Sequence, residues 1–159
     1  MSTGTSTAFG SHGVSAHAGG GAAARAPDPL LALGRVLLGS IFVVSGFAKV
    51  TGLAAFAASL ERRGVPFASA LAAVGACVEF FGGLAIVLGL EVRYTAALMI
   101  AFVIVATLIS HRFWELHDAA ARQAQVTQFS KNVAIIGGFV MLLAAGGGRY
   151  AVERLWRRD

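Results

Sequence analysis

Four long apolar runs divide the chain, at about residues 30–50, 67–90, 94–110 and 132–148. An α-helix rises about 1.5 Å per residue, so about 20 apolar residues cross a hydrocarbon core about 30 Å thick. Lipid offers no partner to unpaired backbone groups, and the runs lack the alternation of a membrane β-barrel, which favours helices. The sequence therefore predicts an all-α, integral membrane four-helix bundle, whose fourth span is short and ends in three glycines.

Both ends of the chain differ from this apolar domain. Residues 1–28 are rich in Gly, Ser and Ala without apolar periodicity, which predicts a disordered tail. They lack the charged start and apolar centre of a secretory signal peptide. Residues 29–152 form the predicted transmembrane domain. Residues 153–159 form a basic tail with Trp156, a composition that predicts a short helix at the membrane interface.

Composition supports a membrane protein and limits its chemistry. Of the 159 residues, 57% are hydrophobic and only 13% charged, more apolar than is usual for a soluble domain. The net charge of +5 lies mainly between the apolar runs, so anionic lipid is the expected partner rather than nucleic acid. The single cysteine, Cys77, allows neither a disulfide framework nor a Cys-rich metal site. No metal is predicted, and the arginine distribution mildly favours cytoplasmic termini in the plasma membrane.

Charged side chains at membrane depth are the first candidates for function, because burying a charge in a bilayer is costly. Glu79 lies in the middle of the second run, while Arg35, Phe42 and Lys49 share one stripe of the first. In an antiparallel pair, Arg35 would lie within about 8 Å of Glu79 in depth. We therefore predict an intramembrane pair of Arg35 and Glu79, with Lys49 as the alternative cation. Proton relay and substrate contact are the functional interpretations, and an interhelical ion-pair lock is the simpler one.

Small residues predict where helices approach closely. In membranes, glycines at intervals of three, four or seven residues allow two helix backbones to pack against each other. The predicted packing positions are Gly39, Gly46, Gly75, Gly82 and Gly83.

A second polar group is predicted where the first and third helices end and the fourth begins, on one membrane face. Its members are Lys49, His111, Glu115, Gln128, Lys131 and Asn132. This cationic group, with one imidazole that titrates near neutral pH, suits an anion, a quinone carbonyl or an acidic partner surface. In the competing interpretation the lysines extend to the interface, where Trp114 anchors the helix. A haem held by two histidines is not expected, because His111 and His117 fall on nearly opposite helix faces.

An ordered set of motifs resembles the DoxX family of small four-helix membrane proteins. The motifs are GRVLLGSIFVVSGFAKV, VEFFGGLAIVLGL, ISHRFWE and QFSKNVAIIGGFVMLLAAGGGRYAV, and the resemblance covers about residues 30–152. The resemblance implies a four-helix inner-membrane protein. The family takes its name from a subunit associated with a terminal quinol oxidase and thiosulfate oxidation. The function expected from it is an accessory subunit of a quinone-linked redox complex, with a protein partner or a homo-oligomer.

Two alternatives stay open beside this expectation. One is a membrane adaptor that localises or stabilises a partner enzyme, and the less favoured one is a small transporter. The sequence has no dinucleotide loop, cysteine cluster or bis-histidine pair of its own. A self-contained enzyme with an intrinsic cofactor is therefore not expected, and quinone is the candidate ligand.

Overall fold

The computed structural model describes Met1 and residues 28–156, and every regular element within them is a helix. The elements are α1 (Asp28–Thr51), α2 (Leu53–Glu61), α3 (Ala68–Leu88), α4 (Val92–Ser110), the 3-10 turn η1 (Phe113–Glu115), α5 (Ala119–Ala145) and the 3-10 turn η2 (Val152–Leu155). Four of these helices are long and apolar enough to cross a membrane, which confirms the predicted all-α four-helix membrane fold. The predicted tail lies outside the described residues except for Met1 and Asp28, as do residues 157–159.

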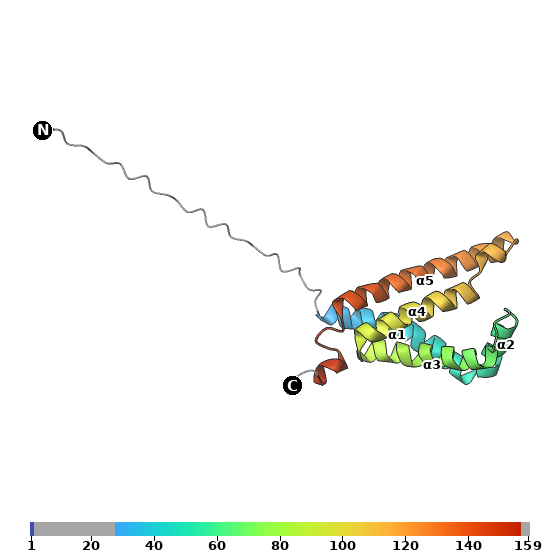
Figure 1. Cartoon of the computed structure of the whole chain (residues 1–159), viewed down its shortest axis with the longest axis horizontal. Coiled ribbons are helices and arrows are strands. Elements are labelled where there is room, and N and C mark those ends of the chain that lie inside the picture. Colours follow the sequence, from blue (N-terminus) through green and yellow to red (C-terminus); the bar gives the residue numbers. More distant parts are fainter. Residues whose placement is uncertain (2–27, 157–159) are drawn as a thin grey trace.

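The bundle is built from two antiparallel helix pairs (Figure 1). Helix α1 packs most extensively on α3, and α4 packs on α5, whereas α1 and α5 make few contacts with each other. The start of α1 and the end of α5 lie at one end of the bundle, and α2 lies at the other. The two ends therefore offer different surroundings to the charged residues of the spans.

Glycine contacts bring α1 and α3 together backbone to backbone. A Cβ added to Gly39 would lie 2.8 Å from the Gly83 carbonyl oxygen, and one added to Gly46 would lie 2.5 Å from the Phe80 amide nitrogen. Both distances are shorter than real Cβ contacts, so these positions accept only glycine unless the helices separate. The contacts fix the register in which α1 runs past α3.

The interface between the two helix pairs uses larger apolar side chains. Gly82 faces Met99 of α4 closely, whereas a Cβ at Gly75 would make only ordinary contacts at 3.9 Å. Around this interface lies the buried core, made of Phe42, Ile86, Val92, Ala96, Met99, Val103, Ile135, Phe139 and Leu142. The core extends from the middle of the spans to the end of the bundle where α1 begins, and it leaves the α2 end more open to polar side chains.

Helix α5 begins well before the span expected at 132–148. It starts at Ala119, where Asp118 accepts a hydrogen bond from the Ala121 amide at 2.8 Å and caps the helix. The added turns are rich in Ala and Gln, which form helices readily although they are too polar to cross a bilayer alone. Helix α2 likewise occupies a connection for which no helix was predicted.

Candidate functional site

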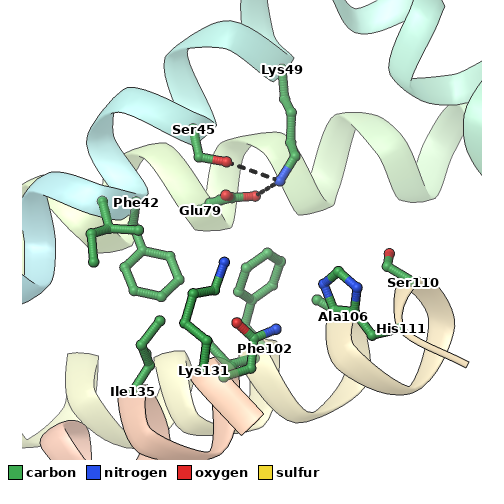
Figure 2. Close-up of a pocket in the computed structure, with 13 residues that line it drawn as sticks. Phe42, Ser45, Lys49, Glu79, Phe102, Ala106, Ser110, His111, Lys131 and Ile135 are labelled. Atoms are coloured by element: carbon green, nitrogen blue, oxygen red, sulfur yellow. Dashed lines mark hydrogen bonds and ion pairs between the residues drawn. The ribbon is translucent and has the colours of Figure 1, made fainter. Parts of the chain in front are cut away.

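A cavity of about 150 Å³ lies between the α1–α3 pair and the α4–α5 pair, toward the α2 end (Figure 2). Four members of the predicted polar group line it together with Glu79: Lys49, His111, Lys131 and Asn132. Its walls also include the apolar side chains of Phe42 and Phe102. The cavity is therefore lined by both polar and aromatic side chains.

Glu79 forms an ion pair with Lys49. The Lys49 Nζ donates to Glu79 Oε2 at 2.5 Å and to Ser45 Oγ at 3.3 Å (Figure 2). The same Nζ lies 5.3 Å from the ring centroid of Phe56, a side chain supplied by α2. The Glu79 side chain is 5% exposed, against 32% for Lys49, so the acid is the deeper partner.

The geometry of this pair follows from the glycine contacts of α1. Gly46 stands directly after Ser45 and lies against the backbone of Phe80, the neighbour of Glu79. A lysine side chain on α1 extends back toward the start of its helix, because helical Cα–Cβ bonds tilt that way. Lys49 thus reaches the level of Glu79 from one turn beyond it.

Lys131 supplies a second amine to the cavity. Its side chain extends from α5 toward the side of the cavity where Glu79 and Lys49 lie (Figure 2). The Lys131 Nζ donates to Gln128 Oε1 at 2.5 Å. An amide oxygen satisfies one donor of an ammonium group but does not compensate its charge. Since Glu79 and Lys49 compensate each other, Lys131 leaves the cavity with positive character.

His111 and Asn132 are held by the contacts between α4 and α5. The His111 Nδ1 lies 2.8 Å from Gln125 Oε1. An amide oxygen can only accept, so Nδ1 donates, and in the neutral ring Nε2 is the nitrogen that can take up a proton. Asn132 Nδ2 donates to Thr107 Oγ1 at 2.8 Å. The α4–α5 hairpin thus presents an imidazole and an amide to the cavity.

Arg35 corrects the predicted pair, because it does not bind Glu79. It is 2% exposed and donates to the Ile86 carbonyl at 3.5 Å and to the Tyr150 carbonyl at 3.2 Å. Ile86 lies in the last turn of α3, where its carbonyl also accepts from the Gly89 amide at 3.2 Å. The glycine register places Arg35 beside this helix end, about two turns from Glu79 along α3.

Two members of the predicted polar group lie outside the cavity. Glu115 is exposed and pairs with Arg112 at 3.1 Å, and Gln128 contacts the site only through Lys131. Ser45 and Ser110 line the cavity, although the sequence prediction missed them. Ser45 could have been found, because it lies four residues before Lys49 on the same helix face.

Helices α1 to α4, which supply most of the residues that line the cavity, match a known family. A model of the DoxX family matches residues 30–112, which span α1 to α4. The chain belongs to the DoxX family. Lys49, Glu79 and His111 lie within the matched residues, and Lys131 and Asn132 follow on α5.

Two curated DoxX-like relatives cover most of the chain. The chain is 32% identical to inner membrane protein YqjF of Escherichia coli K12 over 121 residues, which are 76% of this chain and 87% of that protein. It is 29% identical to inner membrane protein YphA of the same strain over 125 residues, 79% of this chain and 89% of the relative. No solved structure matches the chain. Within the described residues of this DoxX protein, no three His, Cys, Asp or Glu side chains are grouped to hold a metal ion.

Proposed function

We propose that this DoxX protein is an accessory subunit of a membrane redox complex and binds a quinone head group in the cavity between its helix pairs. The observation that carries the proposal is the cavity itself, where the Glu79–Lys49 pair and the additional charge of Lys131 face aromatic walls. Small-molecule sites commonly have this composition, with apolar walls and a few convergent polar groups.

The size of the cavity favours a single ring over a larger ligand. Its volume of about 150 Å³ is that of a protein cavity able to hold benzene, and it is smaller than a typical drug-sized pocket. A quinone ring offers flat apolar faces to Phe42 and Phe102. Its carbonyl oxygens can accept hydrogen bonds from Lys131 and Asn132. A quinone ring therefore fits the cavity in size, and its carbonyl oxygens are acceptors for the donors that line the cavity.

The proton chemistry of a quinone assigns roles to the acid and the imidazole. Reducing a quinone to the quinol consumes two electrons and two protons. Glu79 and His111 are the cavity-lining groups that can carry such protons. The electrons come, in this proposal, from a partner oxidoreductase that carries its own redox cofactor.

The proposal places the protein in the inner membrane with both termini in the cytoplasm. Its relatives YqjF and YphA are inner membrane proteins. In the full sequence, six arginines lie on the side of the termini against four in the opposite loops, and basic residues favour the cytoplasmic side. The six are Arg25, Arg93, Arg149, Arg154, Arg157 and Arg158, and the four are Arg62, Arg63, Arg112 and Arg122. The cavity would then open toward the opposite face.

The first prediction tests quinone binding directly. The purified protein in lipid nanodiscs is titrated with a quinone that has no tail, and the dissociation constant is measured by calorimetry. We expect Lys131→Ala to weaken binding about tenfold or more, since a hydrogen bond to a charged group contributes roughly 1.5–3 kcal/mol. Arg122→Ala, which removes an exposed cation from α5 outside the cavity, is the control and should bind like the unchanged protein. Absence of binding, or equal binding by both variants, would overturn the proposal.

An adaptor that holds a partner enzyme is the second candidate. The early turns of α5 favour it, because they present the exposed polar side chains of Arg122, Gln123 and Thr127. Purification from native membranes distinguishes the two candidates. A stable partner that is lost with Arg122→Ala or Gln123→Ala, without any quinone effect on stability, would support the adaptor.

A further inference from the structure

A second hollow lies beside the cavity, between α1 and α5. It is an apolar groove of about 460 Å³. Its lining includes Leu30, Gly34, Leu37 and Ile41 of α1, and Gly138 and Met141 of α5. Within the described residues, neither helix contributes a charged side chain to it. The groove exists because α1 and α5 make few contacts and meet at glycines.

The groove lies next to the polar cavity. Ile41 lines both spaces, and the groove extends from it to Leu30 near the start of α1. Leu30 and Ile41 are eleven positions apart, which corresponds to about 16 Å along the helix axis. A molecule with its polar group beside Lys131 can therefore continue past Ile41 into an apolar channel within the bilayer.

We propose that the groove holds the isoprenoid tail of the quinone whose ring occupies the cavity. This inference rests on the proposed function and adds the ligand class to it: a lipid-soluble quinone that reaches the site from the bilayer, between α1 and α5. The polar end of such a molecule matches the cavity, and its hydrocarbon tail matches the groove.

The width of the groove argues for a hydrocarbon chain over a helix from a second copy. Its volume spread over about 16 Å gives a cross-section of roughly 30 Å², whereas a helix about 10 Å in diameter occupies about 80 Å². A single flexible chain fits this width and can follow the bend at Ile41.

Two glycines provide a matched test of the groove. A Cβ at Gly34 or at Gly137 would meet no heavy atom within 4 Å, so both positions accept a larger side chain. Gly34 lines the groove, and Gly137 lies on α5 outside it. Gly34→Leu fills the groove, and Gly137→Leu is its control. Met141→Phe, at an exposed position across the groove, is a second filling variant.

The experiment compares two quinones with the same ring in nanodiscs, one without a tail and one with an isoprenoid tail. We expect the unchanged protein and Gly137→Leu to bind the tailed quinone at least about tenfold more tightly, because burying a few methylene groups suffices for that factor. Gly34→Leu and Met141→Phe should lose this preference and keep their affinity for the ring alone.

The outcomes separate the groove from the cavity. Equal preference for the tailed quinone in Gly34→Leu and Gly137→Leu would overturn the groove proposal and leave ring binding intact. A change of oligomeric state in Gly34→Leu would also overturn it, since a second copy would then be the occupant. Failure of the tail-free quinone to bind the unchanged protein would instead contradict the proposed function.

Discussion

Each end of the bundle holds a cation of α1 at the α1–α3 interface, and the two cations have different surroundings. At the end where α1 begins, Arg35 is enclosed by the last turn of α3 and by the segment after α5, and it donates to the carbonyls of Ile86 and Tyr150. At the other end, Lys49 binds Glu79 beside a cavity that also contains Lys131. Arg35 is thus enclosed by protein, whereas Lys49 lies beside a cavity.

The difference shows which buried charges in a membrane protein indicate a ligand site. The acceptors of Arg35 are backbone carbonyls, one in the last turn of α3 and one in the segment after α5, and Arg35 lines neither the cavity nor the groove. At the Glu79 end, the polar groups are side chains, and they line a cavity together with aromatic residues. Polar side chains that converge on an open volume indicate binding, whereas a buried charge alone does not.

The largest expected effect separates the two ends by stability. Arg35→Met should lower the free energy of unfolding by about 2–4 kcal/mol, because the Tyr150 carbonyl loses the Arg35 donor in an apolar environment and the Ile86 carbonyl keeps only the Gly89 amide. Glu79→Gln should lower it by less than about 1 kcal/mol, since Lys49 can still donate to the amide oxygen and is partly exposed. Denaturant titration in detergent, followed by helical circular dichroism, measures both.

Quinone affinity should show the reverse order. Arg35→Met should bind the tail-free quinone like the unchanged protein in the folded fraction, while Glu79→Gln should change the affinity. If Glu79→Gln were the more destabilising variant and left binding unchanged, the Glu79 end would be the structural lock and the comparison would be reversed.

The fold could be predicted from the sequence where bilayer physics dictates the pattern. Apolar length located the four spans, because a helix must match the thickness of the hydrocarbon core. The same criterion cannot detect α2, which has only nine residues, or the polar start of α5. For α5 a local signal existed, since Asp118 before an Ala-rich stretch is a helix cap.

The sequence identifies most of the residues of the candidate site, but it does not identify which cation pairs with Glu79. Arg35 and Lys49 are fourteen residues apart on one stripe of α1, so helix rotation does not distinguish them as partners of Glu79. Depth does distinguish them, and it depends on the register of α1 against α3. Contacts between Gly39 and Gly83 and between Gly46 and Phe80 set this register, which places Arg35 beside Ile86, about two turns of α3 from Glu79. Such contacts between distant residues are not visible in either helix alone.

A smaller effect is expected from the glycine that positions the Glu79 end. Gly46→Ala should destabilise the protein by about 1–3 kcal/mol, because the new methyl group would meet the backbone of Phe80 and the helices would have to separate. The shift should also lengthen the Glu79–Lys49 contact and weaken quinone binding. Gly34→Ala is the control on the same helix, where the methyl group meets no atom within 4 Å. Thermal unfolding in nanodiscs that gave the same midpoint for both variants would show that the α1–α3 register does not depend on this contact.

The smallest expected effect concerns the acid at the Arg35 end. Glu153 accepts from the Val92 amide at 3.0 Å, at the start of α4, and its charge also attracts Arg35. Glu153→Gln keeps an oxygen for the Val92 amide but removes the charge, so we expect a loss of about 0.5–1 kcal/mol that shrinks at high salt. Glu115→Gln, which removes an exposed acid paired with Arg112, should cost less, since exposed ion pairs contribute little. Chemical denaturation at low and high salt measures both variants. An equal loss of stability in both variants would mean that Glu153 contributes no more than a surface charge. The contacts of Arg35 with the carbonyls of Ile86 and Tyr150 would then be what stabilises this end of the bundle.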